Sequence, residues 1–187
     1  KAWGANSSAS DSASIGATTG GTNNTTLFST AGGTAANSGT AVAITVGNTI
    51  TFPAETGTNI GNYNTVLSCL ADGGATANTL SGTNGQASNT LVIGAGDSGK
   101  AIVCTYTNTP KTATLQLAKA WGTNSSASDS ASIGATTGGT NNTTLFSTAG
   151  GTAANSGAAV AITVGNTITF PAETGTNIGN YNTVLSC

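Results

Sequence analysis

The sequence predicts an all-β chain made of tandem β-sandwich repeats, each 118 residues long. Three observations support this fold class. Residues 1–69 recur as residues 119–187 with only two differences, Ala5 against Thr123 and Thr40 against Ala158. The apolar residues stand in short alternating runs separated by Gly- and Asn-rich turns, a pattern typical of strands in a sandwich. No segment spaces its apolar residues as an amphipathic helix does.

The repeat sets the predicted domain organisation, because one period is about the size of a domain. We expect residues 1–109 to form a first sandwich that lacks the start of its first strand. Residues 110–187 are expected to form an incomplete second copy. Near-identical copies are typical of a tandem array, so we expect the chain to be a segment of a longer one. The short, proline-containing connection at residues 109–111 predicts a stiff joint.

The predicted strands follow one another at short intervals. The strand signals in the first part of the chain are weak. Residues 41–46 and 49–52 are predicted to form a hairpin around the Gly47-Asn48 turn. The stretch 71–88 has hardly an apolar anchor and is predicted to be an irregular loop. The remaining expected strands are residues 11–17, 25–29, 62–69, 90–93, 101–107 and 112–121.

The composition excludes several classes of function. Charged residues are 5% of the chain and the net charge is −2 with four lysines, so nucleic acid is not an expected partner. No apolar run approaches the roughly 20 residues that span a bilayer. Histidine is absent. Catalytic sites of the Ser-His-Asp or Cys-His type are therefore excluded, and a metal site is a poor interpretation of the cysteines. We expect no cofactor, no metal and no turnover of a diffusing substrate.

The cysteines predict an extracellular location. One period contains Cys69 and Cys104, and Cys187 is the copy of Cys69. Paired cysteines in such a chain favour a disulfide between Cys69 and Cys104, formed in an oxidising compartment. Two buried thiols are the alternative. The partner of Cys187 would lie 35 residues beyond the last residue, so the odd count fits a segment cut from an array.

A lysine falls on an apolar strand face. In residues 112–121, strand alternation points Leu115, Leu117, Lys119 and Trp121 the same way. Lys1 precedes Trp3 in the same pattern. Burying an unpaired ammonium is costly and lowers the pKa of the amine. The sequence therefore predicts an unusual environment for both lysines.

Two other polar residues could lie near Lys1. In the last strand of the repeat, Asn108 shares a face with Cys104 and Tyr106, and that face is expected to point inward. Glu55 is the only glutamate of the first period and follows Phe52 by three residues. Strict alternation from Phe52 puts Glu55 on the opposite face, unless a bulge at Pro53 turns it inward.

These residues resemble the prealbumin-like (CnaB or SpaA-type) repeats of bacterial surface adhesins and pilins. The matching strings are LQLAKAW at residues 115–121, TFPAETGTNIGNY at 51–63 and CTYTNTP at 104–110. In that family a lysine amine attacks an asparagine carboxamide and expels ammonia, while a buried acid shuttles the proton, so that an intramolecular isopeptide bond forms. The resemblance implies Lys1 as nucleophile, Asn108 as electrophile and Glu55 as the acid.

The second copy repeats part of this set, with Lys119 and Glu173 as the equivalents of Lys1 and Glu55. An alternative interpretation needs no reaction. In it the lysine amine reaches solvent while its stem packs on the tryptophan, and Asn108 only begins a turn before Pro110.

The expected function is structural or adhesive. Sandwich repeats with covalent links and stiff joints would serve as a stalk or filament on a bacterial surface, and their partners would be further copies of the same repeat. One alternative is a self-assembling fibre subunit completed by a strand from a neighbouring chain. Another is a carbohydrate- or ice-binding module with Thr- and Asn-rich faces.

Overall fold

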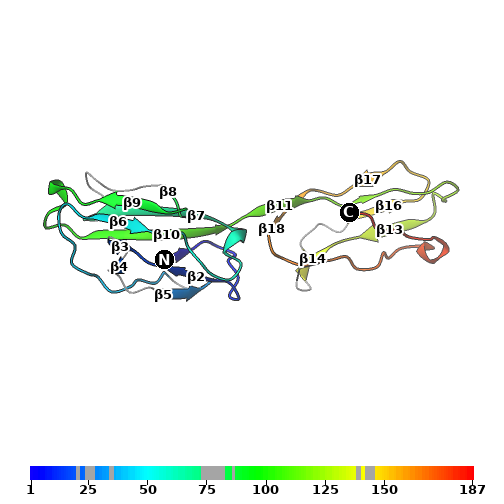
Figure 1. The fold of residues 1–187 in the computed structure, drawn as a ribbon. Coiled ribbons are helices and arrows are strands. Elements are labelled where there is room, and N and C mark those ends of the chain that lie inside the picture. Colours follow the sequence, from blue (N-terminus) through cyan, green and yellow to red (C-terminus); the bar gives the residue numbers. More distant parts are fainter. Residues whose placement is uncertain are drawn as a thin grey trace. The chain divides into compact units, whose positions relative to one another are not determined.

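The computed structural model describes residues 1–19, 22–23, 28–33, 36–72, 83–85, 87–137, 140–141 and 146–187. The chain divides into two compact units, unit 1 (Lys1–Lys111) and unit 2 (Thr112–Cys187) (Figure 1). The all-β prediction is confirmed, because helical structure in the described ranges is limited to single 3₁₀ turns at Ile60–Asn62, Ala95–Asp97 and Ile178–Asn180. No described helix is long and apolar enough to cross a membrane.

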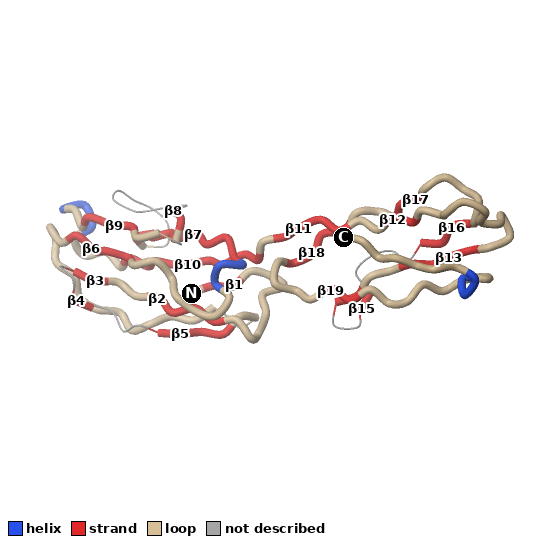
Figure 2. The backbone as a smooth tube through the Cα atoms, turned by 45° about the vertical axis from the view of Figure 1, so that its right-hand side comes forward, coloured by secondary structure: helices blue, strands red, loops and turns tan. Residues whose placement is uncertain are grey.

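Unit 1 is built from two four-stranded sheets and a separate two-stranded sheet, β2-β5 (Figure 2). The first sheet has the order β1-β10-β7-β8, and the second has the order β4-β3-β6-β9. β1 runs parallel to β10, and the other pairs are antiparallel. The strands are β1 (Ala2–Trp3), β2 (Ser12–Ile15), β3 (Thr18–Thr19), β4 (Thr22–Asn23), β5 (Phe28–Ala31), β6 (Thr49–Phe52), β7 (Tyr63–Ala71), β8 (Thr83–Asn84), β9 (Asn89–Val92) and β10 (Ile102–Pro110).

The core of unit 1 lies where the inward faces of the two sheets meet. Strict alternation along β7 buries every second side chain, from Tyr63 to Ala71. On β10 the inward positions are Ile102, Cys104, Tyr106 and Asn108, the face that alternation predicted. The buried apolar cluster consists of Ile15, Ala17, Ile50, Phe52, Leu67, Cys69, Leu91, Ile93 and Tyr106.

The predicted hairpin around Gly47-Asn48 is wrong. Residues 41–46 form no strand in unit 1, and β6 pairs instead with β3 and β9. The turn is fastened to the end of β9, because the Gly47 N–H donates to Ile93 O (2.7 Å) and the Ile93 N–H donates to Asn48 O (2.9 Å). The turn therefore leads into β6 and does not join two paired strands.

Unit 2 contains the copies of only some of these strands. The predicted strand at 112–121 is present as two shorter ones, β11 and β12, which pair with β18 and β17. The strands are β11 (Thr112–Leu115), β12 (Ala118–Lys119), β13 (Ser130–Ile133), β14 (Thr136–Thr137), β15 (Thr140–Asn141), β16 (Phe146–Ala149), β17 (Asn155–Ser156), β18 (Val160–Thr163) and β19 (Ile168–Thr169).

Other strand predictions agree with the structure to within a few residues, as β7, β9 and β10 show. The predicted strand at 25–29 and the predicted loop at 71–88 lie only partly within the described residues. The domain boundary predicted between residues 109 and 110 stays a prediction.

Candidate functional site

Lys1 is held inside unit 1 by the strand that follows it. Its main chain exchanges two hydrogen bonds with Asn37 (2.7 and 2.9 Å), which fixes the direction of the side chain. The Lys1 Nζ donates to Glu55 Oε1 at 2.6 Å, and both side chains are fully shielded from solvent. In unit 1 the amine is therefore buried against an acid and does not reach solvent along the Trp3 ring.

Glu55 reaches the interior because β6 ends before it. The strand stops at Phe52, and Pro53, which has no N–H to add to the ladder, is exposed. The chain then leaves strand geometry, so strict alternation no longer applies and Glu55 turns inward. Its N–H donates to Gly85 O (3.3 Å), while Pro53 O accepts a hydrogen bond from the Tyr106 hydroxyl (2.9 Å).

Asn108 supplies the third buried polar group. It lies on β10 opposite Trp3 of β1, and its residue is 0% exposed. Within the described structure neither carboxamide atom has a hydrogen-bond partner, and the same holds for Glu55 Oε2. Buried polar atoms without partners each cost about 1–3 kcal/mol. Trp3 Nε1 and Asp97 Oδ1 are the other such atoms described in unit 1, so Glu55 and Asn108 account for three of the five.

The surroundings of Lys1 alter the pKa of its amine. Burial lowers the pKa of the Lys1 amine, and the hydrogen bond and charge of Glu55 oppose this effect. The amine also lies 4.6 Å from the centre of the Trp3 ring. A neutral amine carries the lone pair that an attack on a carbonyl carbon requires.

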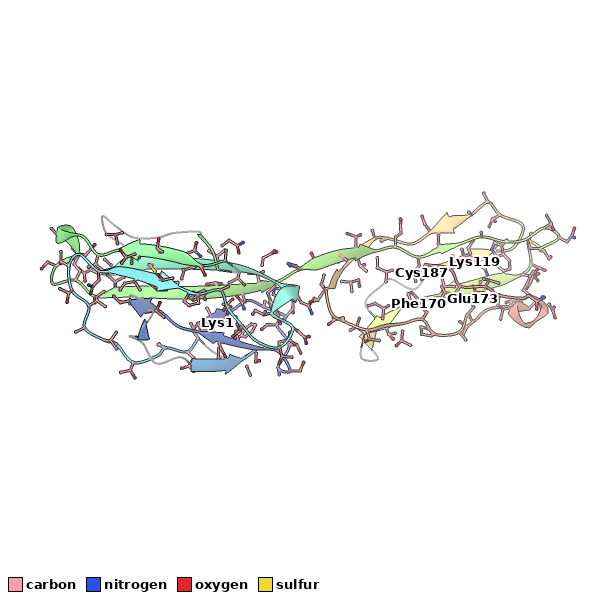
Figure 3. The ribbon with its side chains drawn as sticks, in the orientation of Figure 1. Lys1, Lys119, Phe170, Glu173 and Cys187 are labelled. Atoms are coloured by element: carbon pink, nitrogen blue, oxygen red, sulfur yellow. A yellow bond between two sulfur atoms is a disulfide. The ribbon has the colours of Figure 1, made fainter. Side chains whose placement is uncertain are left out.

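Unit 2 holds a partial copy of the site. Lys119 Nζ lies 2.9 Å from both carboxylate oxygens of Glu173 (Figure 3). Their side chains are 12% and 15% exposed, so this pair is less shielded than the pair in unit 1. The repeat offset of 118 puts the position equivalent to Asn108 outside the 187 residues of this sequence.

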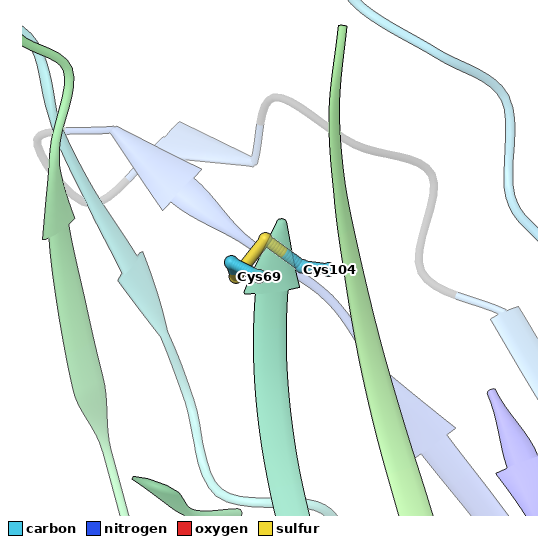
Figure 4. Close-up of a disulfide and its surroundings, with 2 residues drawn as sticks. All are labelled: Cys69 and Cys104. Carbon is cyan, nitrogen blue, oxygen red and sulfur yellow. A yellow bond between two sulfur atoms is a disulfide. The ribbon is translucent and has the colours of Figure 1, made fainter. Parts of the chain in front are cut away.

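A disulfide joins Cys69 and Cys104 (Figure 4). The two residues are direct partners in the antiparallel register of β7 and β10, on the face that points into the core. Cys187 is a free and exposed thiol. Among the described residues no group of three His, Cys, Asp or Glu side chains could hold a metal ion.

One polar cluster was missed by the sequence analysis. Asp11 accepts hydrogen bonds from the Tyr63 hydroxyl (2.5 Å) and from the Asn59 amide (2.9 Å). Asp129 accepts the equivalent bonds from Tyr181 and Asn177. The sequence contained one signal for this cluster, which is the rarity of aspartate: Asp11 is the only aspartate in the first 69 residues. The cluster ties the loop before β2 to the start of β7.

The fold and the site together define a covalently stabilised structural β-sandwich. A family model described as a prealbumin-like fold domain of the SpaA type matches residues 4–110. The chain belongs to this family, whose domains are structural and not catalytic. The chain matches no curated protein and no solved structure.

Proposed function

We propose that this chain is part of an extracellular structural or adhesive protein of a bacterial surface, in which each complete repeat is closed by a Lys–Asn isopeptide bond. In unit 1 the bond joins Lys1 and Asn108. Two observations carry the proposal: Lys1 and Glu55 form a buried pair, and the buried Asn108 carboxamide, on the strand that pairs with β1, has no hydrogen-bond partner. The disulfide and the family membership support an extracellular setting.

The reaction balances with the groups present. Lys1 Nζ transfers a proton to Glu55, and the neutral amine attacks the side-chain carbonyl carbon of Asn108. The tetrahedral intermediate returns to an amide when its C–N bond to the original amino group breaks. Glu55 protonates that group, which leaves as ammonia, and accepts a proton from the attacking nitrogen. The Lys1–Asn108 bond and one ammonia are the products, and each site reacts once.

The bond would change the mechanical role of the strands. Lys1 adjoins β1 and Asn108 lies on β10, so the crosslink fastens the first and last strands of the sandwich to each other. A stretching force on the chain would then pass through the side chains of these two residues. The hydrogen-bonded strands between them would carry no load, which suits a stalk or filament.

Intact mass of the reduced, denatured chain tests the proposal. We expect a mass lower than the sequence mass by one ammonia, and a crosslinked peptide that contains Lys1 and Asn108. Asn108→Ala and Lys1→Ala each restore the full mass expected for the variant, and Glu55→Gln slows or abolishes the loss.

Lys119→Arg is the matched control. The second lysine also pairs with a glutamate but has no asparagine, so this variant keeps the deficit of one ammonia. A wild-type chain of full mass, or a deficit that survives Asn108→Ala, contradicts the proposal.

A further inference from the structure

The segment that follows Glu55 is fastened to the start of β2. Ser14 and Thr56 exchange two backbone hydrogen bonds, with N···O distances of 2.7 and 3.3 Å. The Ser12 N–H donates to Thr58 O (3.3 Å), and the Thr58 N–H donates to the Ser12 hydroxyl (3.1 Å). Glu55 directly precedes this paired stretch, so the position of its carboxylate depends on how firmly the start of β2 is held.

Asp11 holds the end of this pairing from a buried position. Its residue is 6% exposed, and its carbonyl oxygen accepts a hydrogen bond from the Gly32 N–H (2.8 Å). One carboxylate oxygen accepts from the Asn59 amide and the other from the Tyr63 hydroxyl. A single side chain therefore links the loop after Glu55 to the first residue of β7.

Aromatic contacts continue from Tyr63 to the Lys1 amine. The Tyr63 ring meets the Trp3 ring edge-on, with the ring centres 5.1 Å apart. Trp3 lies opposite Asn108 in the β1–β10 register, and its ring centre is 4.6 Å from Lys1 Nζ. The Asp11 carboxylate is thus connected to the Lys1 amine through the two rings, and to the acid beside that amine through the loop.

Unit 2 contains the same set of contacts. Asp129 accepts hydrogen bonds from the Asn177 amide (2.8 Å) and from the Tyr181 hydroxyl. The ring centres of Tyr181 and Trp121 lie 5.2 Å apart, and the Trp121 ring centre is 4.9 Å from Lys119 Nζ. The arrangement therefore accompanies the lysine–glutamate pair in both copies of the repeat.

We propose that Asp11 is a positioning residue for isopeptide formation in unit 1, an inference that rests on the proposed Lys1–Asn108 bond. Through the loop it keeps the Glu55 carboxylate against the Lys1 amine. Through the two rings it keeps the amine beside the strand that carries Asn108. Asp11 touches none of the reacting atoms and exchanges no proton with them. Because the reaction depends on groups held in place, a small displacement slows it strongly.

The rate of ammonia loss tests this role. The chain is made by cell-free translation, denatured in acid at successive times and reduced, and its intact mass gives the fraction that has lost one ammonia. We expect Asp11→Asn to slow the loss by about ten- to a hundredfold, because it removes the charge and one acceptor oxygen. Tyr63→Phe removes only the hydroxyl and should slow the loss less. Asp129→Asn is the matched control in unit 2 and should leave the rate unchanged.

A second measurement separates positioning from a loss of stability. The chain has two glutamates, Glu55 and Glu173, so labelling glutamate with ¹³C gives two side-chain carboxyl signals by NMR. In the Asn108→Ala background no bond forms. There Asp11→Asn should move the Glu55 signal of the folded protein, and Asp129→Asn should leave that signal in place. A purely structural role would lower the folded fraction without moving the Glu55 signal.

The outcomes distinguish this inference from the bond on which it rests. Equal rates of ammonia loss in the wild type and in Asp11→Asn overturn the role of Asp11 and leave the bond intact. A slower loss with an unmoved Glu55 signal overturns it as well. A wild-type chain that loses no ammonia overturns the bond, and the role of Asp11 with it.

Discussion

A buried amine, a carboxylic acid and a carboxamide can complete one another's hydrogen bonds in only a few arrangements. The Lys1–Glu55 contact satisfies one carboxylate oxygen and leaves the other without a partner, as it leaves both carboxamide atoms of Asn108. An isopeptide bond removes the charge on the lysine and releases the amino group of the asparagine as ammonia. At the scale of single residues, the proposed reaction therefore relieves the cost that burial creates.

The candidate residues could be found from sequence, but their arrangement could not. Alternation along β10 correctly predicted that Asn108 points inward. The same rule failed for Glu55, because it assumes that β6 continues through Pro53 and the strand ends at Phe52. Where a strand ends depends on its partners, which a single segment of sequence does not specify.

Tyrosine titration tests the buried polar cluster at Asp11. Burial and the hydrogen bond to Asp11 raise the pKa of Tyr63 to about 12, and burial raises the pKa of Tyr106 further. In the unfolded chain these tyrosines ionise near 10.0. The unfolded state therefore loses protons first, and unit 1 loses stability as pH rises from about 10 to about 12.

The measurement is the ultraviolet absorbance of ionised tyrosine as pH is raised. We expect Tyr63→Phe to remove the step near pH 12 that the native chain shows. A native chain in which all three tyrosines ionise near pH 10.0 would show that the cluster does not exist in solution.

At the scale of elements, the same sequence adopts different structures in the two units. Residues 63–69 form most of β7, whereas their copies at 181–187 form no strand. β7 pairs with β10 in unit 1, and the part of unit 2 that the structure describes includes no strand equivalent to β10. Short apolar patterns predicted the existence of β7, β9 and β10, but the partner strand decides whether such a pattern becomes a strand.

Leu67 and Leu185 form a matched pair for testing this dependence. Leu67 is 0% exposed and Leu185 is 61% exposed, although both occupy the same position of the repeat. Leu67→Ala should lower the free energy of unfolding of unit 1 by about 2–5 kcal/mol through loss of packing. Leu185→Ala should change the free energy of unfolding of unit 2 by less than about 0.5 kcal/mol.

Urea unfolding followed by tryptophan fluorescence measures both variants. Because the chain has two tryptophans, Trp121→Phe leaves Trp3 as the reporter of unit 1 for Leu67→Ala, and Trp3→Phe leaves Trp121 as the reporter of unit 2 for Leu185→Ala. Equal effects of the two substitutions would contradict the role assigned to β10 pairing.

For the whole molecule, the proposed Lys1–Asn108 bond would make a stretching force pass through side-chain bonds and not through the sheets. With the Lys1–Asn108 bond, a pull on the two ends bypasses the chain from residue 2 to residue 107. With the disulfide alone, only residues 70–103 are bypassed. The two cases differ in how much chain is released when the molecule is stretched.

Single-molecule stretching between the N-terminus and the exposed thiol of Cys187 measures this difference directly. Each released residue adds about 3.3–3.6 Å of length. We predict that only residues 109–187 extend in the wild type, and that Asn108→Ala also releases residues 2–68 and 105–107. Release of residues 2–68 from the wild-type chain would contradict the claim that an isopeptide bond carries the load.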